Sequence, residues 1–232
     1  MTGLTRVDRA GVAWLELDRP GSGNAVTTEL LMALRAELTS VQDDPAVRVV
    51  VLSGAGEVFC AGADVKEFGP APAPSARLRR LRLVAHVLGA LRELEQPSVA
   101  AVNGAAVGAG WGLALACDLC FVTATATFCL PEVEKGYRLP SPLVHRLSHV
   151  VGPVRAAEIV LGGARYSADQ AVSGGWATRV LPDRAALTGH TRRFAEELAT
   201  RPRAALAAAT QPLRRSPVTE LSPPPEYLWD EE

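Results

Sequence analysis

Hydrophobic and polar positions along the chain form two kinds of pattern, one typical of strands and one typical of helices, and the two alternate. Continuous or alternating apolar runs predict strands at residues 12–17, 48–52, 98–102, 119–123 and 127–130. Between them, apolar residues recur at helical spacing over residues 30–41, behind a capping Thr27 or Thr28, and again over residues 78–91. Residues 68–75, FGPAPAPS, contain three prolines that cannot continue a helix, so we expect a surface loop there. Strands that alternate with helices are typical of an α/β fold.

The pattern becomes purely helical after Pro182. Two helices are predicted, over residues 185–199 and 203–214, and residues 216–232 combine prolines with an acidic end that is typical of a tail or a packing arm. We therefore expect a core at residues 1–182 that holds the site, followed by a helical C-terminal segment and tail at residues 183–232.

Composition narrows the possible partners. Hydrophobic residues make up 48% and charged residues 21% of the chain, as in a globular protein with a packed core, and the net charge is -1. Such a balance provides no field that would attract nucleic acid or an anionic membrane, so neither is expected as a partner. Because no apolar run approaches the roughly 20 residues of a spanning helix, we expect a cytoplasmic protein.

The four cysteines lie in apolar stretches and are expected to be buried thiols. Cys117 and Cys120 form a CxxC pair, but no second pair or histidine cluster accompanies them. We therefore expect no metal site.

Two segments place small residues where a core would normally place large ones. The first, FCAGADVKEF at residues 59–68, would let a ligand approach the backbone and leave N–H groups free to donate. The second, NGAAVGAGWGLALACD at residues 103–118, opens an apolar helix, and free N–H groups at a helix start favour negative charge. A plain strand-to-helix turn and tight helix packing, respectively, are the alternatives.

A third segment, FCLPEVEKG at residues 128–136, carries Glu132 directly after Pro131 in a mostly apolar setting. A partly desolvated carboxylate has a raised pKa that suits proton transfer near neutral pH, whereas a solvated loop acid is the alternative. If Glu132 faces the site, Glu134 should point outward in an extended backbone.

The order of these three segments resembles the signature of the enoyl-CoA hydratase/isomerase (crotonase) superfamily. LELDRPGSGNAV at residues 15–26 and AAEIVLGGARYSADQAVSGGWATRVLP at residues 156–182 extend the resemblance, which covers residues 7–215. It implies a crotonase-like spiral of ββα units with a helical C-terminal part, assembled as a homotrimer or hexamer. It also implies an acyl-CoA thioester as the substrate and no cofactor, because coenzyme A arrives with the substrate. Family members commonly continue beyond residue 215, so a shortened C-terminal part and an altered assembly are expected.

The resemblance also assigns residues to roles. The backbone N–H groups of Ala63 and Ala109 would form an oxyanion hole for the thioester carbonyl, and Glu132 would carry the proton. The substrate-binding positions on the two sides of that site are Ala61, Gly62, Asp64, Val65, Lys66, Gly108, Gly110 and Gly112. Within the strip of residues 61–66, Lys66 is a candidate for contact with the CoA phosphates, with a solvated lysine as the alternative.

The chain departs from the family pattern in two places. GAGWGLA stands where a family hydratase reads close to GGGCELA, so one of two catalytic glutamates is replaced by Gly112. Adding water requires two acid–base groups, whereas shifting a double bond requires one proton carrier, which favours isomerase-like chemistry. A hydratase with a substitute group, a decarboxylase-like enzyme and a non-catalytic acyl-CoA-binding homologue remain open. The second departure is YRLPSPLV at residues 137–144, whose prolines should stiffen the wall of the acyl pocket.

Other charged residues lie outside the three segments. The four histidines are expected on helix surfaces, and the basic cluster is expected to form a solvated helix face, with contact to CoA phosphates as the alternative. The histidines are His86, His145, His149 and His190, and the cluster comprises Arg77, Arg79, Arg80 and Arg82.

Overall fold

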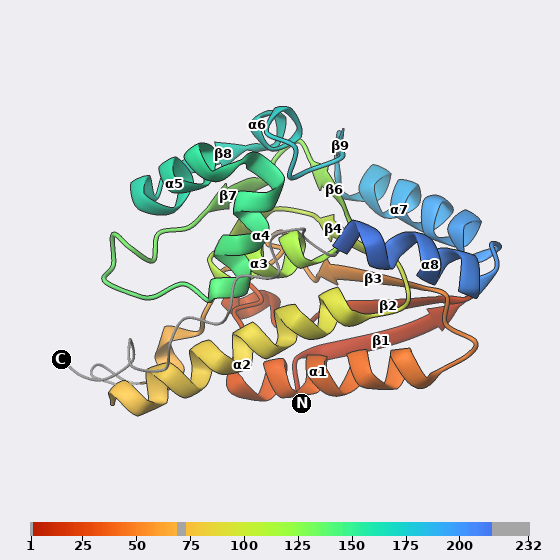
Figure 1. The fold of residues 1–232 in the computed structure, drawn as a ribbon, viewed down its shortest axis with the longest axis horizontal. Coiled ribbons are helices and arrows are strands. Elements are labelled where there is room, and N and C mark those ends of the chain that lie inside the picture. Colours follow the sequence, from red (N-terminus) through yellow and green to blue (C-terminus); the bar gives the residue numbers. More distant parts are fainter. Residues whose placement is uncertain (1, 69–72, 215–232) are drawn as a thin grey trace.

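The computed structural model describes residues 2–68 and 73–214, and in it two β-sheets are surrounded by helices (Figure 1). The main sheet has six strands in the order β1 (Leu4–Arg9), β2 (Val12–Leu17), β3 (Val49–Gly54), β4 (Ser98–Val102), β6 (Leu119–Thr123) and β9 (Arg179–Leu181). All neighbours pair in parallel except β1, which is antiparallel to β2. The smaller sheet has the order β5 (Ala105–Val107), β7 (Thr127–Cys129) and β8 (Arg165–Ser167).

Helices connect the parallel strands, as parallel pairing requires. The connecting helices are α1 (Thr28–Asp43), α2 (Pro74–Glu93), α3 (Ala109–Ala116), α4 (Ser141–Val151), α5 (Pro153–Gly162) and α6 (Ala168–Ser173), and α7 (Arg184–Ala199) and α8 (Arg203–Arg214) follow the last strand. Successive turns of the chain add a strand to the main sheet, an extended segment to the smaller one, and a helix, as in β4–β5–α3. The predicted α/β spiral of ββα units with a helical C-terminal part is therefore confirmed.

Helices bury both faces of the main sheet, which explains why its strands read as nearly continuous apolar runs. On one face, Leu15 and Leu52 pack with apolar residues of α1, α2 and α3. On the other face, Val12 and Val51 pack against Leu187 of α7. Figure 1 shows α1 and α2 side by side along one side of the main sheet and α7 apart from them, on its other side.

Most predicted elements are present. Thr27 caps α1, since its hydroxyl accepts a hydrogen bond from the Leu30 N–H at 3.1 Å. The proline-rich loop ends earlier than predicted, because α2 begins at Pro74, and a proline in a first turn loses no helical hydrogen bond. The chain around that loop at residues 69–72, and the predicted tail from residue 215 on, lie outside the described residues.

Four strands were not predicted. β1 alternates with charged residues and is mostly exposed at the edge of its sheet, and β5, β8 and β9 have three residues each. Among the described residues no helix is long and apolar enough to cross a membrane. All four cysteines are buried and unpaired, as predicted.

Candidate active site

The first wall of the site is the extended strip that follows β3. It begins at Cys60, whose N–H donates to the Ala105 carbonyl at 3.0 Å and whose carbonyl accepts from the Val107 N–H at 2.9 Å. These two bonds pair the strip with β5 in parallel. The backbone of this strip is therefore fixed relative to the strand that leads into α3.

At Ala63 the strip pairs with Val26, on the side opposite to β5. The Val26 N–H donates to the Gly62 carbonyl at 2.8 Å, and the Asp64 N–H donates to the Val26 carbonyl at 2.9 Å. In a parallel bridge of this kind, the central residue directs its own N–H away from the partner strand. The exposed Ala63 therefore presents its N–H on the edge opposite Val26, and no hydrogen bond among the described residues uses that group.

The second wall is the start of α3. Gly108 precedes this helix with a φ of +54°, which favours glycine, and donates its N–H to the Cys129 carbonyl at 2.9 Å. Ala109 is the first helical residue, so its N–H has no partner within the helix, and the described residues supply no other acceptor. The helix dipole adds partial positive charge at the same place.

The two walls touch each other. A Cβ added to Gly62 would lie 2.8 Å from the Val107 carbonyl oxygen and 3.8 Å from the Ala109 nitrogen. A Cβ added to Gly110 would overlap the Cys60 carbonyl oxygen. The glycines in both predicted segments thus permit a close backbone approach, which places the segments of Ala63 and Ala109 next to each other.

Glu132 lies against the second wall, in the turn that follows β7. A Cβ on Gly108 would collide with its Oε1, and its Oε2 is buried with no hydrogen-bond partner in the described part of the chain. Burial raises the pKa of the Glu132 carboxyl, and its own backbone N–H and then the positive charge of Lys135 oppose this shift without cancelling it. Glu132 is therefore not a solvated loop acid.

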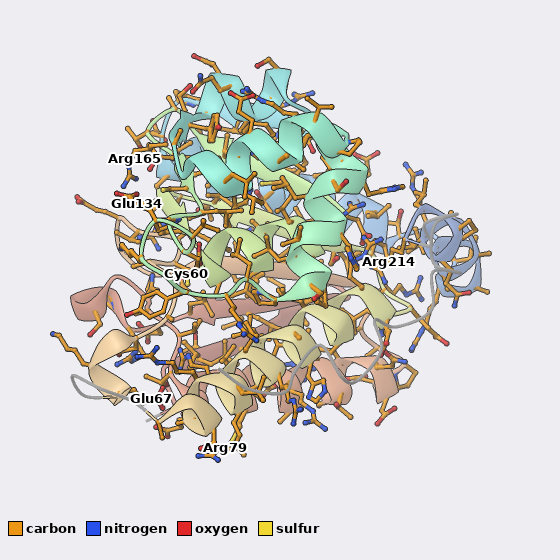
Figure 2. The ribbon with its side chains drawn as sticks, turned by 60° about the vertical axis from the view of Figure 1, so that its left-hand side comes forward. Cys60, Glu67, Arg79, Glu134, Arg165 and Arg214 are labelled. Carbon is orange, nitrogen blue, oxygen red and sulfur yellow. The ribbon has the colours of Figure 1, made fainter. Side chains whose placement is uncertain are left out.

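Glu134 lies two residues further along and is exposed, as predicted. Figure 2 shows it at the outer edge of the molecule, whereas Cys60 of the first wall lies farther in. Two backbone donors without a partner among the described residues and one desolvated carboxyl group thus lie around the start of α3, an arrangement that can stabilise a developing oxyanion and move a proton beside it.

Comparison with known proteins agrees with this geometry. The sequence model described as enoyl-CoA hydratase/isomerase matches residues 8–222. The chain belongs to the enoyl-CoA hydratase/isomerase family. Over 184 residues it is 39% identical to the probable enoyl-CoA hydratase echA12 of Mycobacterium leprae, a match that covers 76% of this chain and 63% of that protein. The chain thus spans less than two thirds of the length of that relative.

Two further relatives show the range of the family. The chain is 35% identical to 4-chlorobenzoyl coenzyme A dehalogenase-2 of an Arthrobacter species, over 83% of this chain and 70% of that protein. The crystal structure of an enoyl-CoA hydratase from Bacillus anthracis superposes with a TM-score of 0.86 at 30% identity, covering 91% of this chain and 82% of that one. The crotonase-like fold predicted from the sequence is therefore confirmed.

Gly112, which the resemblance predicts at the position of a hydratase glutamate, is tightly packed. A Cβ on Gly112 would lie 2.8 Å from Leu143 Cδ1 of α4 and 3.3 Å from Leu88 Cδ1 of α2. The predicted prolines set the start of α4, since Pro140 is its N-cap residue and Pro142 lies in its first turn. Leucine side chains therefore occupy the space beside Gly112, which no sequence pattern had indicated.

The neighbouring Trp111 is fully buried in an aromatic cluster. Its ring centroid lies 5.4 Å from that of Phe128, 6.1 Å from that of Tyr166 and 5.5 Å from that of Trp176. Such tilted pairs add stability beyond the buried area. The cluster packs α3 against β7 and β8.

The predicted substrate-binding strip of this family member divides into exposed and anchored residues. Ala61 and Lys66 are exposed, and Val65 and Lys66 lie in the short 3-10 helix η2 (Val65–Phe68). The Asp64 carboxylate is instead held by Arg19, at 3.0 Å from its Nη2, and also accepts from the Lys66 N–H at 3.2 Å. Asp64 thus anchors the strip.

The prediction of a solvated arginine face is wrong for Arg80. This side chain is buried and donates to the Glu67 carboxylate and to the Val26 carbonyl, whereas Arg77, Arg79 and Arg82 are exposed. Arg80 was detectable in principle, because it lies one helical turn before the buried stripe that contains Val84, Leu88 and Leu91.

Among the histidines, His86, His145 and His149 are exposed, as predicted. His190 is instead half-buried on α7, with its ring edge-on to Phe121 at 4.7 Å, and burial lowers its pKa. His190 packs on the face of the main sheet that lies opposite to α3, so its role is in the packing of α7.

Proposed function

We propose that the protein binds an acyl-CoA thioester and stabilises its enolate between the N–H groups of Ala63 and Ala109 while Glu132 moves the proton. The observation that carries this proposal is the desolvated carboxyl group of Glu132, held against Gly108 beside a free helical N–H. Each preorganised donor of this type lowers the barrier by about 3 kcal/mol. The raised pKa of Glu132 suits a group that must both accept and return a proton.

The favoured reaction is a double-bond shift in a 3-enoyl-CoA. Glu132 would take a proton from the α-carbon, the electron pair would delocalise onto the thioester oxygen, and the same carboxyl would return the proton to the γ-carbon. Hydration requires a second acid–base group, and in this chain its usual position is Gly112, packed against Leu143 and Leu88. A glutamate at position 112 would have to displace Leu143.

The alternative is hydration with a substitute group, as the names of several relatives suggest. One assay distinguishes the reactions: the protein is incubated in D2O with 3-enoyl-CoA and 2-enoyl-CoA of equal chain length. We expect isomerisation of the 3-enoyl ester with deuterium at the α- and γ-carbons. Formation of 3-hydroxyacyl-CoA as the main product would favour a hydratase, and binding without any exchange would favour a non-catalytic acyl-CoA-binding protein.

We further propose that coenzyme A enters as part of the substrate, with Lys66 near its phosphates, and that the reaction needs no metal or redox cofactor. A homotrimer or hexamer is the proposed assembly. Light scattering of the full chain at low micromolar concentration measures its mass directly, and a stable monomer would contradict this part of the proposal.

A further inference from the structure

A buried guanidinium lies behind the strip that carries Ala63. Arg80 is only 7% exposed, and the loss of water around its charge lowers its pKa even though the Glu67 carboxylate is adjacent. A buried charge is costly unless polar partners surround it. Arg80 extends the buried stripe of α2 by one turn, so its side chain points into the protein, where it reaches the Val26 carbonyl.

The partners of Arg80 connect it to the first wall. One guanidinium nitrogen donates to the Val26 carbonyl, the same oxygen that accepts the Asp64 N–H at 2.9 Å. Another nitrogen donates to Glu67, whose carboxylate also accepts the Thr28 N–H at 2.9 and 3.1 Å. The pair thus ties α2 to η2, to the start of α1 and to the bridge that orients Ala63.

The charge of Arg80 also reaches the strip electrostatically. Burial raises the pKa of the Cys60 thiol to about 11, and the positive charge of Arg80 is one of the influences that oppose this rise. The Glu67 carboxylate beside Arg80 offsets part of this charge, so the pair acts on the strip mainly through its hydrogen bonds.

We infer that Arg80 and Glu67 form a positioning pair for the Ala63 donor: they hold Val26 so that the Ala63 N–H stays aligned with that of Ala109. This inference rests on the proposed function. The pair acts on the enolate more than on the neutral thioester, so its loss should reduce turnover and enolate stabilisation with little change in substrate binding.

Acetoacetyl-CoA tests this without requiring turnover. The carbon between its two carbonyls is acidic, and its enolate absorbs in the near ultraviolet, so the enolate fraction of the bound ligand reports directly on stabilisation of the oxyanion. The parent protein should increase that fraction relative to free solution at the same pH.

The variants are Arg80→Met, Arg80→Lys and Glu67→Gln, with Arg79→Met as the matched control from the exposed side of the same helix (Figure 2). For Arg80→Met we expect the bound enolate-to-ketone ratio and kcat to fall about tenfold, less than the 10²–10³ that loss of a whole donor costs, with KM unchanged within about twofold. Arg80→Lys should recover part of this loss because its ammonium can still donate a hydrogen bond to Glu67 or to the Val26 carbonyl. Glu67→Gln should show the same pattern at about threefold, and Arg79→Met should match the parent.

The outcomes separate the inference from the function on which it rests. A parent protein that leaves acetoacetyl-CoA in its keto form would overturn the oxyanion hole and the positioning pair together. A parent that enolises the ligand, with Arg80→Met equal to Arg79→Met, would overturn the pair alone. If Arg80→Met fails to fold, Glu67→Gln decides, and an unchanged enolate fraction in that variant contradicts the inference. A loss of thermal stability without a change in the enolate fraction would assign the pair a purely structural role.

Discussion

The two backbone donors of the site have the same chemistry but are held in place by different means. Ala109 stands at the start of a helix whose eight residues are all buried, so close packing fixes the direction of its N–H. Ala63 is itself exposed, and its extended strip is held by backbone bridges to β5 and to Val26 and by two ion pairs, Arg19–Asp64 and Arg80–Glu67. Substitutions that disturb packing should therefore affect the Ala109 donor most, and substitutions that remove charged contacts should affect the Ala63 donor most.

The largest effect is expected where packing fixes the site. Gly110→Ala would drive a Cβ into the Cys60 carbonyl, a backbone atom that cannot move without breaking its hydrogen bond to Val107. We expect the free energy of unfolding to fall by about 3 kcal/mol. Chemical denaturation measures this, with Gly89→Ala on α2 as the control. A Cβ there meets nothing within 4 Å, so the control should gain about 0.5–1 kcal/mol. Equal stabilities of the two variants would contradict this account of α3.

A smaller stability effect is expected on the Ala63 side. Asp64→Asn removes the charge that Arg19 holds in a partly exposed setting, which should cost about 1 kcal/mol of unfolding free energy. Because the strip that carries Ala63 would lose an anchor, kcat should fall even though the variant stays folded. Glu158→Gln, in the exposed pair with Arg155, should change neither quantity measurably. An Asp64→Asn enzyme with normal kcat would show that the strip is held without the Arg19–Asp64 pair.

The smallest effect concerns the pH dependence of stability. Since burial raises the pKa of Glu132 in the folded state, the native protein binds its proton more tightly than the unfolded chain does. Its stabilising contribution is complete below the ordinary carboxyl pKa and is lost as pH rises through the raised value. Glu132→Gln should therefore gain stability relative to the parent with increasing pH and then level off. Urea midpoints at a series of pH values measure this, and a parallel pair of profiles would contradict the desolvation.

Much of the fold could be predicted because it is encoded in local pattern. β2, β3, β4 and β6 lie between two helical layers, so their sequences are continuously apolar and easily recognised. In β1 apolar residues are interspersed with charged ones at an exposed edge of the sheet. The strands β5, β8 and β9 have three residues each and are too short to show a period. Their pairing depends on neighbours supplied by distant parts of the chain.

The candidate site divides in the same way. Its two walls were predictable because close backbone approach demands small residues, which mark both segments in the sequence. The packing of Leu143 against Gly112 and the bonds from Arg80 to Val26 join positions that are far apart in the chain. No local pattern specifies such contacts, although the helical register of Arg80 could have indicated its burial.

The central claim, that Glu132 alone moves the proton beside two backbone donors, is tested most directly by deuterium exchange into bound acyl-CoA. Glu132→Gln keeps the shape of the side chain but removes its acid–base capacity, whereas Glu134→Gln changes an exposed acid two residues away. We predict that Glu132→Gln lowers the rate of α-proton exchange by about 10²- to 10⁴-fold, with acyl-CoA affinity nearly unchanged, and that Glu134→Gln exchanges at the parent rate. Exchange by Glu132→Gln within a factor of about two of the parent would place the proton carrier elsewhere and contradict the mechanism.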